Sequence, residues 1–196
     1  MRHAGIGLLV VIGFLSGSVS ADERVFSGPQ VGEKLTPFKV TGVYDDAAGK
    51  DFDPVVQAGG KPTVVVFVHK VTRPSIGLTR LLMNYAANRK KDGLHTALVF
   101  LSEDATETTA WMKRARGAIP KGIPVGISPD GKEGPGAYGL NRNMTLTVLV
   151  AKDDKVTANF ALVQPGVKAD LQKIVKEIVK LVGGKVPTLT QLGAER

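Results

Sequence analysis

Cysteine is absent from all 196 residues of the sequence. No disulfide bond can therefore form within the chain, and its stability must come from side-chain packing. The same absence excludes lipid attachment to a cysteine next to a processed leader. It also excludes a thiolate nucleophile, which disulfide exchange and peroxide reduction both require.

Histidine is also scarce, with three residues in the chain. His69 and His95 are the two that follow the N-terminal segment, and no His-x-x-x-His spacing occurs. A group of acidic residues lacks the calcium-loop pattern with its distal glutamate; it consists of Asp45, Asp46, Asp51 and Asp53. We therefore expect no bound metal and no cofactor.

Aromatic residues make up 6% of the chain, whereas lysine and arginine outnumber aspartate and glutamate by 26 to 18. The formal net charge of +8 favours acidic ligands or partners through long-range attraction. The basic residues are spread along the chain, without the interleaved aromatics that bind single-stranded nucleic acid. We expect a solvated basic surface and no nucleic-acid partner.

Long hydrophobic runs are missing as well. The apolar stretch from Ile6 to Leu15 is shorter than the roughly 20 residues that span a bilayer. It follows Arg2 and precedes the small residues that end at Ala21, which is the pattern of a secretory signal peptide over residues 1–21. We therefore expect an exported chain, periplasmic or extracellular after cleavage near Ala21, with no membrane anchor.

Hydrophobic periodicity beyond residue 37 predicts alternating strands and helices. Thr63–Val68 is a continuous β-branched and aromatic run, typical of a strand buried on both faces. Apolar residues then recur at helical spacing from Pro74 to Gly93, with Thr72 as the expected N-cap. The other expected elements are a partly exposed strand (Phe38–Tyr44), a buried strand (Leu94–Leu101), a helix (Asp104–Ala115), a short helical piece (Ala137–Leu140), a hairpin (Thr147–Ala151 with Val156–Val163) and an amphipathic helix (Val167–Val182). Asp45–Gly60 and Gly117–Gly136 are expected to be loops.

Several local motifs resemble those of one family, in the family's order. Val31–Phe38 (VGEKLTPF) resembles its first segment, and Thr63–Ser75 (TVVVFVHKVTRPS) resembles its central strand and active-site helix. Three later motifs continue the likeness: SPDGK at 128–132, AYGL at 137–140 and TVLVAKD at 147–153. The chain thus resembles the redoxin (AhpC/TSA) family, which includes peroxiredoxins and exported thioredoxins of the TlpA and ResA type.

The resemblance implies an α/β thioredoxin-like fold, in which helices flank a central mixed sheet. The alternation of strands and helices along the chain agrees with that fold. We expect this domain to cover residues 22–183 and to be followed by a flexible C-terminal tail over residues 184–196.

The departures from the family pattern concern its chemistry. Thr72 and Ser75 stand where the Cys-x-x-Cys residues of thioredoxins belong, and Ser75 also matches the peroxidatic cysteine of peroxiredoxins. The family's cis-proline is replaced at Thr145 or at the neighbouring Met144. Because a serine hydroxyl cannot replace a thiolate at neutral pH, the resemblance predicts no thiol redox activity.

The segment from His69 to Ser75 remains the candidate site, because a helix N-terminus that follows a strand offers free N–H groups to an anion. His69, Lys70, Arg73 and Thr145 are the candidate ligand-binding residues, and Arg73 would act as a bidentate donor. A second interpretation is structural: Thr72 and Ser75 cap the helix, His69 ends the strand, and the two cations face water.

Three functions remain open. The first is a binding or scaffolding protein that holds an unidentified peptide, protein or anionic ligand in the former active-site groove. The second is a non-thiol enzyme that uses Ser75, Thr72 or His69 in hydrolysis or group transfer. The third is a redox-associated protein that acts only with the thiol of a partner.

Overall fold

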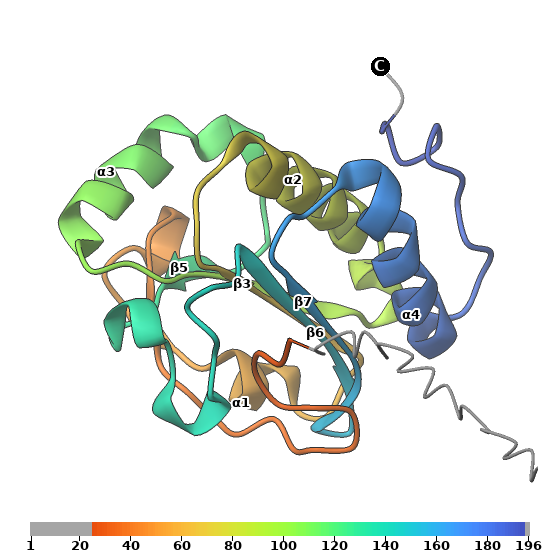
Figure 1. Ribbon diagram of the computed structural model, residues 1–196, viewed down its shortest axis with the longest axis horizontal. Coiled ribbons are helices and arrows are strands. Elements are labelled where there is room, and N and C mark those ends of the chain that lie inside the picture. Colours follow the sequence, from red (N-terminus) through yellow and green to blue (C-terminus); the bar gives the residue numbers. More distant parts are fainter. Residues whose placement is uncertain (1–24, 195–196) are drawn as a thin grey trace, which may run out of the picture.

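The computed structural model describes residues 25–194, so the expected signal peptide over residues 1–21 lies outside the described part. Seven strands form one mixed sheet in the order β2-β1-β5-β4-β3-β6-β7 (Figure 1). Their bounds are β1 Val40–Gly42, β2 Asp51–Phe52, β3 Thr63–Val68, β4 His95–Phe100, β5 Val125–Ile127, β6 Leu146–Lys152 and β7 Lys155–Leu162.

Strand β3 is the centre of this sheet. It pairs in parallel with β4 on one side and antiparallel with β6 on the other. Strand β4 continues in parallel to β5, whereas β7, β1 and β2 are added antiparallel at the two edges. The parallel steps from β3 to β4 and from β4 to β5 are the βαβ units that the alternation of strands and helices predicts.

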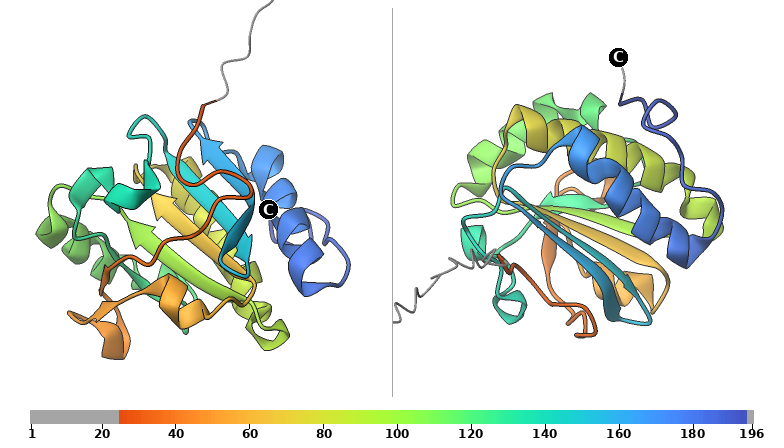
Figure 2. Two further views of the ribbon diagram at one scale, coloured as in Figure 1. Left: turned by 90° about the horizontal axis from the view of Figure 1, so that it is seen from below. Right: turned by 45° about the vertical axis from the view of Figure 1, so that its right-hand side comes forward.

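Helices cover both faces of the sheet (Figure 2). Helices α2 (Arg73–Asn88), α3 (Ala105–Arg114) and α4 (Gln172–Val182) lie on one face. Helix α1 (Pro54–Ala58) and the lead-in from residue 25 lie on the other. None of the helices between residues 25 and 194 is long and apolar enough to cross a membrane.

The strict alternation of side chains along β3 divides the core into two layers. Val64, Val66 and Val68 pack with the apolar residues of α2 and α4, whereas Val65 and Phe67 pack on the side of α1. Each of these five residues is at most 1% exposed. The expectation of a strand buried on both faces is therefore confirmed, with the expected bounds.

Helix starts follow from side-chain caps. Helix α2 begins after Thr72, whose hydroxyl accepts from the Ser75 N–H, and Pro74 lies in the first turn. Asp104 caps α3 by accepting from the Glu107 N–H. Both caps confirm the expected helix starts. The final amphipathic helix differs in detail, because a π-helical turn over Val167–Leu171 precedes α4.

Both segments expected to be loops contain further elements. Within Asp45–Gly60, β2 is followed by α1, whose start is fixed by the Asp53 carboxylate accepting from two backbone N–H groups. Within Gly117–Gly136, β5 extends the parallel ladder for three residues. Strand β1 is shorter than the expected Phe38–Tyr44, because its partner β5 offers three residues and the chain turns back after Gly42.

Two smaller differences concern the second half of the chain. The helical piece expected at Ala137–Leu140 is a 3₁₀ turn over Gly136–Tyr138. In the tail, Leu192 and Ala194 pack against the core layer of α2 and α4. The flexibility expected of residues 184–196 stays a prediction.

Strand β5 passes so close to β1 that a side chain has no room at Gly126. A Cβ atom there would lie 2.6 Å from Val40 Cγ1 and closer still to the Thr41 carbonyl oxygen. We expect Gly126→Ala to lower the free energy of unfolding by about 1–3 kcal/mol through overpacking. Urea denaturation measures the change, with Gly117→Ala as a control because its added Cβ would meet no atom within 4 Å. Equal stability of the two variants would contradict this packing.

Candidate functional site

The candidate site lies where β3 ends and the chain enters α2. The N–H groups of His69 and Lys70 both donate to the carbonyl oxygen of Thr145, at 3.0 and 3.3 Å. Thr145 itself is 6% exposed, and its hydroxyl donates to the carbonyl oxygen of Val163. Thr145 therefore fixes the strand end through its backbone, while its side chain is engaged within the fold.

Ser75 is fully buried, and its hydroxyl is engaged by the backbone. The Oγ atom donates to the Lys70 carbonyl oxygen at 2.8 Å and accepts from the Thr72 N–H at 2.8 Å. In return the Thr72 hydroxyl accepts from the Ser75 N–H at 3.2 Å, which completes a capping box. Both positions that match the family's cysteines therefore build the start of α2.

His69 is oriented by hydroxyl groups on other elements, and not by Ser75. Its Nε2 atom lies 2.9 Å from Thr147 Oγ1. The Thr147 oxygen lies 2.6 Å from Ser27 Oγ, which accepts from the Asn141 N–H at 3.0 Å. Ser27 and Thr147 are each at most 1% exposed. Because His69 contacts Thr147, no nucleophile–base pair with Ser75 is formed.

The direction of this relay determines the His69 tautomer. Ser27 Oγ already accepts from Asn141, and among residues 25–194 Thr147 is the acceptor within reach of its proton. Thr147 must then donate its own proton to Nε2 of His69. In the opposite direction two buried groups would lack a partner, the Ser27 proton and the Nδ1 lone pair, whereas in this direction one does, the Nδ1–H; each such group costs about 1–3 kcal/mol. The neutral ring therefore carries its proton on Nδ1.

The charge state of His69 follows from its surroundings. Burial, with the nearby Lys70 charge as the second cause, lowers the pKa of His69 to about 4. The ring is therefore neutral at pH 7. Its Nδ1 atom is buried and has no hydrogen-bond partner among the described residues. This leaves a donor that lacks an acceptor, which is rare for a buried polar group.

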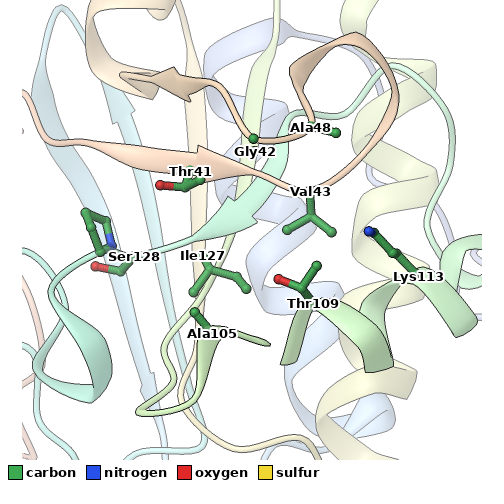
Figure 3. Close-up of a pocket in the computed structure, with 11 residues that line it drawn as sticks. Thr41, Gly42, Val43, Ala48, Ala105, Thr109, Lys113, Ile127 and Ser128 are labelled. Carbon is green, nitrogen blue, oxygen red and sulfur yellow. The ribbon is translucent and has the colours of Figure 1, made fainter. Parts of the chain in front are cut away.

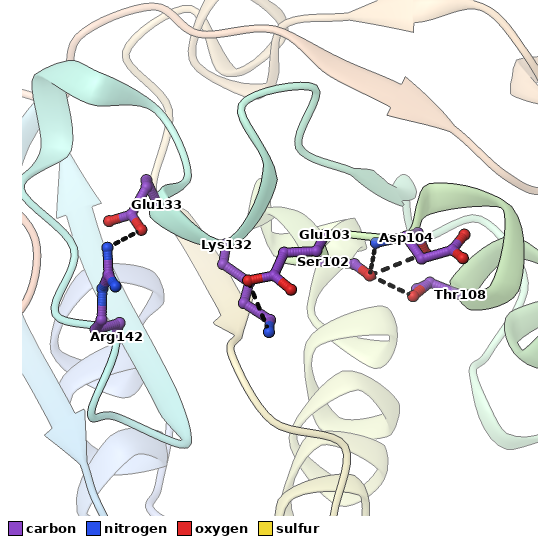
Figure 4. Close-up of polar contacts among 7 residues, drawn as sticks. All are labelled: Ser102, Glu103, Asp104, Thr108, Lys132, Glu133 and Arg142. Carbon is purple, nitrogen blue, oxygen red and sulfur yellow. Dashed lines mark hydrogen bonds and ion pairs between the residues drawn. The ribbon is translucent and has the colours of Figure 1, made fainter.

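His69 and Lys70 line a polar pocket of about 290 Å³. Two ion pairs form the rest of its wall: Lys132 with Glu103 at 2.9 Å, and Arg142 with Glu133 (Figure 4). Lys70 contacts the carbonyl oxygen of Asn143 at 3.4 Å and has no carboxylate partner within the described residues. The pocket thus contains one basic side chain without a carboxylate partner, while the Nδ1 atom of His69 is buried.

The turn that carries Glu103 is fixed by its neighbours. Ser102 Oγ donates to the Asp104 carbonyl oxygen and receives hydrogen bonds from the Asp104 N–H and the Thr108 hydroxyl (Figure 4). These bonds hold residue 103 between β4 and α3, so the Glu103 carboxylate stays within reach of Lys132. Both carboxylates of the pocket wall are therefore paired with its basic side chains, Glu103 with Lys132 and Glu133 with Arg142.

Thr72 and Arg73 line a different hollow from the pocket of His69 and Lys70. They line an open hollow of about 540 Å³ together with Val71, Ile76, Arg80 and Trp111. The expected site residues are thus divided: His69 and Lys70 face one pocket, Thr72 and Arg73 another, and Ser75 and Thr145 are buried. No group of three or more metal-ligating side chains occurs between residues 25 and 194.

Sequence reasoning missed several residues of the polar pocket. Lys132 lies in the SPDGK motif, whereas Glu103 and Arg142 lie in loops and Glu133 ends a 3₁₀ turn, all without a spacing signal. Ser27 and Thr147 are 120 positions apart, so the sequence offers no local pattern that joins them.

Comparison with known proteins addresses the fold. No protein-family model matches the chain, and no curated protein matches it significantly. A solved structure of a candidate thiol:disulfide interchange protein DsbE from Chlorobium tepidum is similar, with a TM-score of 0.60 and 21% identity, over 79% of this chain and 99% of that one. A candidate protein disulfide isomerase from Bacteroides thetaiotaomicron gives a TM-score of 0.61 and 16% identity, over 82% and 96%.

Peroxidoxin BcpB from Mycobacterium tuberculosis is similar over 80% of this chain and 98% of that one, with a TM-score of 0.54 and 15% identity. The chain has a thioredoxin-like fold. These identities are low, so the likeness concerns the fold alone. A thioredoxin-like chain without cysteine has no sulfur to attack a disulfide or a peroxide, so it has no thiol redox activity of its own.

In this thioredoxin-like site, Ser75 is expected to be a structural residue. Ser75→Ala leaves the Lys70 carbonyl oxygen and the Thr72 N–H without their buried partner, so we expect a loss of about 1–3 kcal/mol in unfolding free energy. Thermal and urea denaturation measure it. Thr106→Ala is the control, since Thr106 is exposed on α3, and it should change stability by less than about 0.5 kcal/mol. A Ser75→Ala protein as stable as the native chain would contradict this role.

Proposed function

We propose that this chain is an exported thioredoxin-like binding protein that holds an anionic ligand in the pocket lined by His69 and Lys70. The observation that carries the proposal is the Lys70 ammonium group, which has no carboxylate partner among the described residues, in a pocket whose two carboxylates are both paired. An oxygen anion in this pocket pairs with the Lys70 ammonium group beside the neutral His69 ring.

The charges of the pocket favour an anion over a cation. Its wall contains three basic side chains and two carboxylates, and each carboxylate already pairs with one of the basic groups. A cationic ligand would have to break one of these ion pairs, whereas an anion is attracted to the unpaired Lys70. The net charge of +8 on the whole chain adds a long-range attraction of the same sign.

The proposal also includes export of the chain from the cytoplasm. This part rests on the sequence of residues 1–21, with a basic start, an apolar stretch and small residues up to Ala21. The chain would then work in the periplasm or outside the cell, where a fold without disulfides depends on packing alone.

The two other functions have less support in the geometry. A non-thiol enzyme needs a reactive hydroxyl, but the Ser75 hydroxyl is buried and already bonded to the backbone. The Thr72 hydroxyl caps α2, and His69 contacts Thr147. A redox role with a partner thiol would assign every electron-transfer step to the partner, because this chain contains no sulfur nucleophile.

Isothermal titration tests the proposal with two probes, succinate and inorganic phosphate, at low ionic strength. We expect one of the two anions to bind, and added salt to weaken binding. Lys70→Ala should reduce the affinity by about tenfold, which corresponds to one charge-assisted hydrogen bond. Lys91→Ala is the matched control, since Lys91 is exposed and does not line the pocket.

The outcome of the two probes also identifies the ligand class. Binding of succinate alone indicates a carboxylate ligand, and binding of phosphate alone indicates a phosphate-bearing one. Failure of both anions to bind the folded native chain would refute the proposal, as would equal affinities of the native and Lys70→Ala proteins.

A further inference from the structure

A second pocket lies between α3 and the strands β1 and β5, toward the end of the strand order that is away from β6 and β7. Its volume is about 470 Å³, within the range of about 300–1,000 Å³ common for small-molecule sites. Figure 3 shows Val43 and Ile127 beside the side chains of α3. None of the residues of the polar pocket lines this one, so the two sites are separate.

The pocket exists because its walls carry short side chains. Gly42, Ala48 and Gly49 form one side, and Ala105 begins the other. Gly42 cannot be replaced by a larger residue without a clash, because a Cβ there would overlap the Ala47 carbonyl oxygen. Buried Val43 adds an apolar wall. A hydrocarbon group would therefore be shielded from water in this pocket.

One face of α3 supplies the polar groups that are free, because the other two hydroxyls of the lining are engaged: Thr41 donates to Asp51, and Ser128 accepts from the Asp130 N–H. Ala105, Thr109 and Lys113 follow each other at intervals of four residues, so their side chains lie on the same side of the helix. The Thr109 hydroxyl and the Lys113 ammonium group have no hydrogen-bond or ion-pair partner among the described residues. No carboxylate lines the pocket. An apolar wall thus ends at a cation and a hydroxyl one helical turn apart.

We propose that this pocket is a second binding site, which takes an aliphatic monocarboxylate of medium chain length. The carboxylate pairs with Lys113 and accepts from Thr109, and the hydrocarbon chain lies against Val43 and Ile127. An uncharged alcohol would lose the ion pair, and an alkylamine would be repelled by Lys113. The site is independent of the anion pocket at His69 and Lys70.

Titration calorimetry with octanoate tests this site on the full chain. We expect octanoate to bind and hexanoate, which is two methylenes shorter, to bind roughly fifteenfold more weakly, since each buried methylene changes affinity by about fourfold. Hexylamine should not bind. Lys113→Gln should weaken octanoate binding about tenfold. Lys176→Gln on α4 is the matched control, because Lys176 is exposed and distant from the lining residues.

A second variant tests the apolar wall. Ala105→Leu places a larger side chain at the exposed start of α3, where it fills the pocket without disturbing the core. It should reduce octanoate affinity at least fivefold while circular dichroism and the urea midpoint stay unchanged. The proposal is overturned if octanoate does not bind the native chain, or if it binds Lys113→Gln and Ala105→Leu as tightly as the native chain. Unchanged octanoate binding by Lys70→Ala would show that the two sites are separate.

Discussion

The burial of β3 on both faces is the constraint on which the rest of the structure depends. All six of its residues are at most 2% exposed, and both of its backbone edges are paired. The strand can therefore neither slide nor tilt, because a shift by one residue would exchange the two core layers. Its end at Val68 sets the positions of His69, the Thr145 carbonyl oxygen and the first turn of α2.

Because the end of β3 is fixed in this way, the backbone of a thioredoxin-like site can form without cysteine. Thr72 and Ser75 keep the helix start in place through the capping box, so the backbone geometry does not require thiols. The chemistry left at the site is that of hydrogen-bond donors and cations. The buried relay through Ser27 and Thr147 holds His69 as a neutral donor beside Lys70. Anion binding is the function that we propose for these groups.

The sequence predicted the elements that carry strong local patterns. The bounds of β3 and the Thr72 cap are confirmed, and the β6–β7 hairpin is confirmed with each strand end one residue from the expected one. Asp153 and Asp154 adopt the left-handed backbone of a tight turn, with φ of 53° and 56°. Strand β5 was missed because three residues between glycines and prolines carry no periodicity. The polar pocket could not be predicted in full, since Lys132 and Arg142 reach it from separate loops through tertiary packing.

The central claim is that His69, held neutral by burial and by the relay through Thr147, lines an anion-binding pocket with Lys70, and ¹⁵N nuclear magnetic resonance of its imidazole ring tests it most directly. We predict a neutral ring protonated on Nδ1 at pH 7, a pKa of about 4, and a shift of the ring ¹⁵N signals when the anion that binds beside Lys70 is added. A ring protonated on Nε2, or one that titrates near the ordinary value of about 6.5, would contradict it.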